Sequence, residues 1–211
     1  MSILIGICGR TGSGKTSGAK FIQKEMQSNE CNVGIISMDK FYKELSDQDH
    51  ELALQNNFNF DTIDSFDLDA LLNVIKAVSK GRKCRYKPYD HITHKCLEQI
   101  EVGPFDVVIF EGLYLFVDEN ICKSFDLNIF MEIDADESLM RRIRTHQIQQ
   151  RQQTIITTLD QYERFVKPAY DEFVGPSKKH ANIIIPRGAH NKPAMTSVFS
   201  YIKSKLNKSA N

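Results

Sequence analysis

The sequence predicts an α/β fold in which helices cover both faces of a doubly wound parallel sheet of about five strands. The first observation is that short, continuously apolar runs, typical of strands buried on both faces, alternate with longer segments of helical periodicity. The second is that a glycine-rich segment joins the first apolar run directly to the first helical segment. With 211 residues the chain can build one sizeable core, so we expect residues 1–211 to form a single domain.

The apolar runs and the periodic segments give the order of the elements. The predicted strands are Ile3–Cys8, Val33–Met38, Val107–Phe110, Leu127–Ile133 and Asn182–Ile185. The predicted helices are Lys15–Gln27, Asp67–Lys80, Asp136–Gln150, Thr158–Phe173 and Lys192–Leu206. The second helix shows the pattern most clearly, because its aliphatic residues recur every three or four positions and Gly81 follows as a C-terminal cap.

Residues 82–104 depart from this alternation. They are rich in polar and aromatic side chains and contain Pro88, so they suit neither a buried strand nor a helix. We expect them to form an irregular β-hairpin flap that is inserted over the sheet.

The glycine-rich segment has the spacing of a phosphate-binding loop. It reads Gly-Arg-Thr-Gly-Ser-Gly-Lys-Thr and matches G-x-x-x-x-G-K-[ST] between a strand and a helix, the order that the motif requires. Glycines permit a tight turn that points backbone N–H groups at phosphate oxygens, the lysine adds positive charge, and the threonine hydroxyl can ligate Mg²⁺. The residues expected to hold a nucleotide are Gly9, Thr11, Gly12, Ser13, Gly14, Lys15 and Thr16.

Two acidic residues follow predicted strands. Asp39 comes after Val33–Met38, and Glu111 comes after Val107–Phe110. Ligands of open α/β sheets bind beyond the carboxyl ends of the strands, so both carboxylates are expected beside the phosphate loop. A carboxylate there can hold Mg²⁺ or take the proton from an attacking hydroxyl, whereas one acid alone could simply cap the next turn. The two together favour a catalytic role.

Charge and composition argue against several other classes of protein. Lys plus Arg and Asp plus Glu number 27 each, so the net charge gives no reason to expect a nucleic-acid partner or a membrane surface. The first apolar run begins at Ile3, and we expect neither a signal peptide nor a membrane-spanning segment. Five scattered cysteines without a Cys-x-x-Cys pair fit a reducing cytoplasm better than a disulfide framework or a zinc site.

Ordered segments along nearly the whole chain, from Gly6 to about Ala194, resemble the uridine kinase (uridine–cytidine kinase) family. The matching segments are Met38–Tyr42, Phe58–Asp61, Tyr89–His94, Phe110–Gly112, Gln161–Tyr162, Phe165–Pro168 and Ile184–Gly188. The resemblance implies a P-loop kinase fold with a helical lid, which falls at residues 141–160. It also implies pyrimidine salvage, by transfer of the γ-phosphoryl group of ATP to the 5′-hydroxyl of uridine or cytidine with Mg²⁺, and a homotetramer.

The same resemblance assigns roles to residues of this chain. Asp39 matches the general base and Asp61 the acid that grips the ribose hydroxyls. Thr16, Glu111 and Asp39 match the magnesium side of the site, and Arg187 lies in the loop matched to the adenine of ATP. The residues matched to the nucleoside site are Asp39, Tyr42, Asp61, Tyr89, His91, His94, Arg142 and Gln161. The expected catalytic set is Asp39, Lys15, Arg142 and the lid residue Arg151.

Two places depart from the family pattern. His91 stands where the family usually has a large aromatic residue near the nucleobase, and a histidine is smaller and titrates near neutral pH. The lid reads one residue longer, and counting back from Tyr162 puts Gln152 at a glycine and Gln153 at an arginine of the family's lid. An arginine that neutralises charge on the transferred phosphoryl group can be worth about 10³-fold in rate, so this change predicts a lower kcat. The alternative is that the extra residue rotates the helix so that Arg144 supplies the missing charge.

Two other functions fit the sequence. A related P-loop kinase could act on another small hydroxyl compound, such as nicotinamide riboside, pantothenate or ribulose phosphate, although Asp61 and Tyr89–His94 favour a ribonucleoside. The chain could also be a nucleotide-binding protein whose turnover is impaired by the altered lid. The retained phosphate loop and strand-end acids argue for a working enzyme, because a pure binder needs no base beside the magnesium site.

Overall fold

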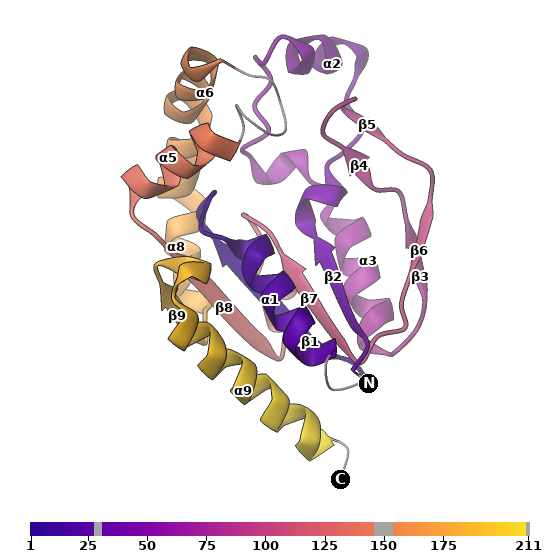
Figure 1. Cartoon of the computed structure of the whole chain (residues 1–211). Helices are drawn as coiled ribbons and strands as arrows, with labels where there is room; N and C mark the ends of the chain where they lie inside the picture. The colour runs from indigo at the N-terminus through magenta and orange to yellow at the C-terminus, as the bar shows by residue number, and fades with distance from the viewer. Residues whose placement is uncertain (28–30, 146–153, 210–211) are drawn as a thin grey trace.

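The computed structural model describes residues 1–27, 31–145 and 154–209, and its centre is a five-stranded parallel sheet with the order β2-β7-β1-β8-β9 (Figure 1). The strands are β1 (Ile3–Gly9), β2 (Val33–Ser37), β7 (Val107–Glu111), β8 (Leu127–Glu132) and β9 (Ile183–Pro186). Every neighbouring pair runs parallel, and strands are added on both sides of β1. The predicted doubly wound α/β fold and its five strands are therefore confirmed.

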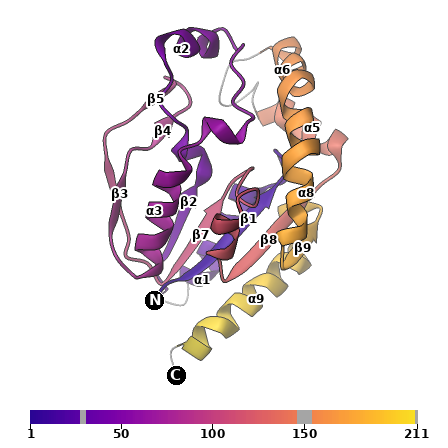
Figure 2. The same ribbon diagram turned by 180° about the vertical axis from the view of Figure 1, so that it is seen from behind.

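Helices cover both faces of this sheet. α1 (Lys15–Gln27) and α9 (Lys192–Ser209) pack on one face (Figure 1), and α3 (Leu68–Ser79) packs on the other (Figure 2). Successive side chains of a strand point to opposite faces, so in β1 Leu4 joins the core under α3 while Ile5 joins the core under α1. This two-sided burial explains why the strands read as continuous apolar runs.

The segment after β2 carries two short 3₁₀ turns and one helix that the sequence did not predict. The turns are η1 (Met38–Phe41) and η2 (Ile63–Ser65), and the helix is α2 (Asp47–Leu54). α2 has little apolar periodicity, but its start carries a signal: the Ser46 side chain accepts from the backbone N–H of Asp49 at 3.2 Å and donates to the Asp49 carboxylate at 2.8 Å. Ser-x-x-acid before a helix is a capping arrangement.

Residues 82–104 contain antiparallel pairs, as expected of a hairpin. β3 (Cys84–Tyr86) pairs with β6 (Ile100–Val102), and β4 (Tyr89–Asp90) pairs with β5 (Lys95–Cys96). The stem lies beside α3, and the tip rises towards α2 (Figure 1). Tyr86 stacks on Phe41 of η1 with ring centroids 4.6 Å apart, which ties the hairpin to the end of β2.

One helical run replaces the single helix predicted at Thr158–Phe173. It comprises α6 (Ile155–Gln161), the π turn η4 (Tyr162–Val166), α7 (Lys167–Ala169), the π turn η5 (Tyr170–Val174), α8 (Gly175–Ser177) and the 3₁₀ turn η6 (Lys178–His180). In each π turn the closing N–H donates to the carbonyl five residues back. Pro168 and Pro176 directly follow the two residues that donate these N–H groups. A proline has no N–H to donate and its ring clashes with the preceding turn, which gives a physical reason why the helix widens into a π turn at each place.

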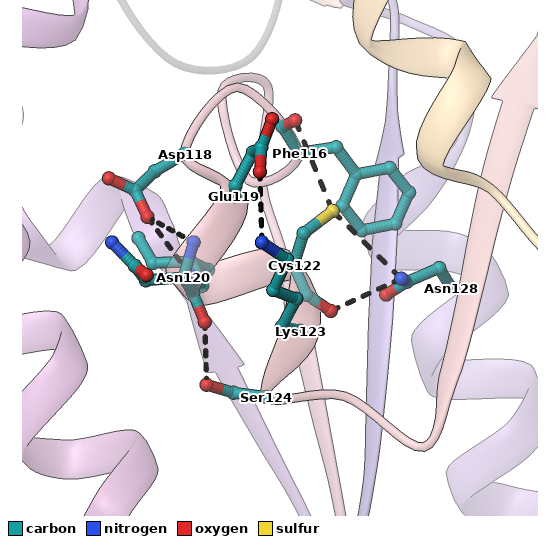
Figure 3. Close-up of polar contacts among 9 residues, drawn as sticks. Phe116, Asp118, Glu119, Asn120, Cys122, Lys123, Ser124 and Asn128 are labelled. Carbon is teal, nitrogen blue, oxygen red and sulfur yellow. Dashed lines mark hydrogen bonds and ion pairs between the residues drawn. The ribbon is translucent and has the colours of Figure 1, made fainter.

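The connection from β7 to β8 runs through the short helix α4 (Glu119–Lys123), shown in Figure 3. The Asp118 carboxylate caps this helix by accepting from the backbone N–H of Asn120 at 2.8 Å. At the other end, Nδ2 of buried Asn128 donates to the carbonyl of Cys122 at 3.2 Å. α5 (Ala135–Thr145) then follows β8. No described helix combines the length and the apolar character needed to cross a lipid bilayer.

Candidate active site

Three neighbouring strands end side by side and carry the groups that the sequence singled out. Glu111, the last residue of β7, is in register with Ser37 of β2 and with Ile7 of β1. Asp39 and Gly9 each lie two residues beyond those partners. The phosphate loop, Glu111 and Asp39 therefore follow one another across the carboxyl edge of the sheet.

The loop after β1 has a backbone that only glycine fits. Gly9 has φ +146° and Gly14 has φ +88°, which side chains disfavour. A Cβ on Gly9 would lie 2.2 Å from the carbonyl oxygen of Met131, and one on Gly14 would lie 2.9 Å from Cβ of Ala189. The two glycines thus let the loop pass tightly between β8 and the segment after β9.

Helix α5 holds the outer side of this loop. The Ser138 hydroxyl donates to the carbonyl of Thr11 at 2.7 Å, and Nη1 of Arg141 donates to the carbonyl of Gly12 at 3.0 Å. These bonds occupy carbonyl oxygens only, so they use none of the backbone N–H groups with which such a loop binds phosphate.

The 3₁₀ turn η7 (Gly188–His190) holds the other side. The backbone N–H of Ala189 donates to the carbonyl of Ser13 at 3.3 Å, and Gly188 packs so closely on that carbonyl that no side chain fits there. Arg187 precedes this turn in a left-handed conformation with φ 65°, and its side chain is exposed. The residue predicted for the adenine side thus lies next to the phosphate loop.

The Lys15 ammonium group lies back over the start of the loop. It donates to the carbonyl oxygens of Gly9 at 3.0 Å and of Arg10 at 3.2 Å. Neutral carbonyls are weaker acceptors than phosphate oxygens, so this cation is in place to change partners when a nucleotide enters.

Oxygen atoms converge at the end of β7. The Thr16 hydroxyl donates to Oε1 of Glu111 at 3.2 Å. Burial raises the pKa of Glu111, which is 4 % exposed, and the negative charge of nearby Asp39 raises that pKa further, while Lys15 lowers it. Asp39 itself is exposed. A hydroxyl and two carboxylates are the hard oxygen donors that Mg²⁺ prefers, so these residues fit a magnesium site.

An aromatic cluster, consisting of Tyr42, Phe60, Tyr89, His91 and His94, lies beyond Asp39. Tyr42 and Tyr89 each lie within 5.4 Å of the His91 ring, measured between centroids. The Tyr89 hydroxyl and Nδ1 of His94 are 3.3 Å apart, and Phe60 stacks on His94 at 5.2 Å. The predicted base-side residues are thus brought together. Phe60, to which the sequence assigned no role, joins them.

Asp61 directly follows Phe60 of this cluster along the chain. Its backbone N–H donates to Oδ1 of Asn59 at 2.9 Å. Burial, and then the negative charge of Asp61, raise the pKa of Tyr114, so the carboxylate lies near that buried phenol, three residues beyond Glu111. The acid predicted to grip a ribose therefore lies on the same side as the aromatic cluster.

Two further predicted residues come from helices on the opposite side of the carboxyl edge, where Figure 1 shows α5 and α6 across from α2 and the hairpin tip. Arg142 of α5 and Gln161 of α6 are both buried. Nε2 of Gln161 donates to the carbonyl of Asn56 at 3.1 Å, which links α6 to the segment after α2. Arg151, with Gln152 and Gln153, lies outside the described residues.

Comparison with known proteins gives consistent matches. A family model described as the phosphoribulokinase / uridine kinase family matches residues 4–194. The chain is 37 % identical over 204 residues to uridine-cytidine kinase B of Dictyostelium discoideum, covering 96 % of this chain and 82 % of that protein. It is 36 % identical over 210 residues to uridine-cytidine kinase 2-B of Danio rerio, covering 97 % and 80 %. Phosphoribulokinase from Rhodobacter spheroides shares the fold, with a TM-score of 0.64 and 15 % identity over 88 % of this chain and 70 % of that one.

Proposed function

Because the chain belongs to the phosphoribulokinase / uridine kinase family, we propose that it is a pyrimidine ribonucleoside kinase, which transfers the γ-phosphoryl group of ATP to the 5′-hydroxyl of uridine or cytidine. The observation that carries the proposal is the order of groups along the carboxyl edge of the sheet. The phosphate loop, Glu111 and Asp39 stand at three neighbouring strand ends, and the aromatic cluster continues on the Asp39 side. Donor and acceptor sites are therefore adjacent, as in-line phosphoryl transfer requires.

On the donor side we assign the β- and γ-phosphates of ATP to the backbone N–H groups of the loop from Thr11 to Gly14. The N–H of Ser13 would then leave the carbonyl of Arg10, to which it now donates. Lys15 leaves the two carbonyls that it now contacts and binds phosphate oxygens, because a charged acceptor makes the stronger hydrogen bond. Arg187, exposed beside the turn that packs on Ser13, is assigned to the adenine.

Thr16, Glu111 and Asp39 are the residues that would hold Mg²⁺. When bound, the ion supplies charge neutralisation to the β- and γ-phosphate oxygens. The observation that favours this fit is that burial, and then the negative charge of Asp39, raise the pKa of Glu111, and a bound divalent cation would offset both effects.

On the acceptor side Asp39 is the proposed general base. Its exposed carboxylate takes the proton from the 5′-hydroxyl as that oxygen forms a bond to the γ-phosphorus and the bond from phosphorus to the oxygen of ADP breaks. Arg142 contributes positive charge to the transferred group.

The nucleoside is recognised by the sugar and by the base. We assign the ribose hydroxyls to Asp61, since a carboxylate can accept two O–H bonds at once. We assign the base to the aromatic cluster, and the amide of Gln161 reads its edge with a donor and an acceptor together. His91 provides a smaller stacking surface than a tyrosine or phenylalanine.

A coupled ADP-release assay tests this function directly. Purified protein with ATP and Mg²⁺ is offered uridine, cytidine, their 2′-deoxy forms, nicotinamide riboside and pantothenate. We expect turnover with uridine and cytidine, and none from a Lys15→Met variant. Turnover with one of the other compounds only would make the chain a related kinase, and nucleotide binding without turnover of any acceptor would contradict the proposal.

We also propose a homotetramer and a cytoplasmic location. The family resemblance supports the first, and size-exclusion chromatography with light scattering would then report four times the 24.2 kDa of one chain. The five cysteines support the second, because all are free thiols, as expected in a reducing compartment.

A further inference from the structure

The side chain of Arg10, the second residue of the phosphate loop, points out of the loop and lies on an aromatic ring. Its guanidinium carbon is 3.4 Å from the centroid of the Tyr170 ring. Its Nε atom is buried and has no hydrogen-bond partner among the described residues. The N–H groups of a buried guanidinium are normally hydrogen-bonded, so the Nε–H of Arg10 is a donor that can accept a new partner.

The backbone of Arg10 forms hydrogen bonds with two other residues of the phosphate loop. Its carbonyl oxygen accepts from the backbone N–H of Ser13 at 3.1 Å and from the Lys15 ammonium group at 3.2 Å. The lysine of such a loop reaches the β- and γ-phosphates. The backbone of Arg10 is thus one hydrogen bond away from the cation of the nucleotide site, and its long side chain starts from there.

The ring under Arg10 is held in a fixed place. Tyr170 is the first residue of the π turn η5, and its carbonyl accepts from the N–H of Gly175 at the end of that turn. A Cβ on Gly175 would lie 3.2 Å from the edge of the Tyr170 ring. π turns in helices often mark functional sites. Here the turn presents an aromatic face to a loop arginine.

We propose that Arg10 is a catalytic residue whose guanidinium leaves Tyr170 when ATP enters the loop and binds oxygens of the γ-phosphoryl group. The inference rests on the proposed kinase function. A guanidinium binds phosphate oxygens through two charge-assisted hydrogen bonds, which are stronger than its attraction to a partly exposed aromatic ring. The Tyr170 ring then holds the Arg10 side chain in the nucleotide-free protein. The contact neutralises charge on the group in transfer and changes no bond of the reaction itself.

Nucleotide binding gives the first test and needs no nucleoside. Dissociation constants are measured for ADP and for the β,γ-imido analogue of ATP, both with Mg²⁺. Arg10→Ala should weaken binding of the analogue about 10-fold and leave ADP within about twofold, because only the analogue carries the γ-phosphoryl group. Arg10→Lys should recover part of the loss, since it keeps the charge but not the paired donors.

Turnover gives the second test. With uridine as acceptor, Arg10→Ala should lower kcat by about 10²- to 10³-fold and change KM for uridine by less than about threefold. Tyr170→Leu, which removes the ring and keeps the arginine, should retain kcat within about threefold. Arg164→Ala is the matched control, because Arg164 also stacks on a ring, that of Phe165 at 4.7 Å, but belongs to the helical run and not to the loop.

Three results would overturn the proposal. Equal weakening of ADP and of the analogue would mean that Arg10 only shapes the loop. An equal loss of kcat in Arg10→Ala and Tyr170→Leu would mean that the pair is a structural clamp. An unchanged kcat in Arg10→Ala would exclude a catalytic role. Arg10→Gln, which keeps length and polarity but no charge, gives the same readings if thermal unfolding shows that the alanine variant does not fold. Should the wild type phosphorylate no nucleoside, the proposed function fails, while the two binding constants still decide the contact of Arg10.

Discussion

Asp39→Asn isolates the proposed general base, because the change removes the negative charge and the proton-accepting ability while it keeps the shape of the side chain. Asp39 is exposed on the turn after β2. Its backbone N–H donates to the Ser37 hydroxyl at 3.4 Å, and that bond uses no carboxylate oxygen. The substitution should therefore change the free energy of unfolding by less than about 0.5 kcal/mol, as for an ordinary surface position.

The loss in rate follows from the role of the residue. Removing a positioned general base lowers kcat by at least about 10²-fold, which corresponds to about 2.7 kcal/mol of activation free energy. A second effect acts on Glu111, whose pKa is raised in part by the charge of Asp39. In the variant the pKa of Glu111 should fall, so the Mg²⁺ dependence should shift while the affinity for ADP changes little.

The assay is the initial rate of ADP release at saturating ATP and uridine, with thermal unfolding measured on the same samples. Asp69→Asn is the matched control, since Asp69 is an exposed aspartate in the first turn of α3 and has no role in the proposed site. The control should keep wild-type kcat. An Asp39→Asn protein that retains more than a tenth of wild-type kcat would refute the assignment of the base.

Three further outcomes are expected. In metal-free protein the raised pKa of Glu111 means that the native state binds the carboxyl proton more tightly than the unfolded state does. The free energy of unfolding should therefore fall as pH rises from the ordinary value of 4.5 through the raised pKa. Urea unfolding in EDTA should show this slope, and Glu111→Gln should abolish it. Asp61→Ala should weaken the binding free energy of uridine by about 1.5–3 kcal/mol per lost charge-assisted bond, which is measured as a higher KM, and should erase a wild-type preference for uridine over 2′-deoxyuridine. Equal use of the two sugars by the wild type would contradict this role of Asp61. Gly9→Ala should abolish ATP-induced thermal stabilisation, because its Cβ would lie 2.2 Å from the carbonyl of Met131; a normal shift would mean that the loop tolerates a side chain.

The sheet and the phosphate loop were predictable because their signals are local. Each strand is buried on both faces and so reads as an apolar run, and the loop needs glycines at fixed spacing. The placement of two carboxylates beside the phosphate loop was predictable as well. Asp39 and Glu111 directly follow apolar runs, and neighbouring parallel strands end at the same edge of a sheet.

The features that were missed carry weak local signals or depend on contacts between distant segments. α2 has few buried residues, so its cap at Ser46 was the one local signal of a helix. The π turns arise from prolines inside a run that otherwise has helical periodicity. The stacking of Phe60 on His94 and of Arg10 on Tyr170 joins residues far apart in the chain, and no periodicity of the sequence records such pairs.

Phosphorylation of a pyrimidine ribonucleoside is established most directly by identifying the product. ATP, Mg²⁺ and uridine are incubated with the protein, and the phosphorus spectrum and the mass of the products are recorded. The site described here predicts uridine 5′-monophosphate and ADP in equal amounts, and neither product with the Lys15→Met variant. Release of ADP without any uridine monophosphate, or phosphate on a hydroxyl other than the 5′ position, would contradict it.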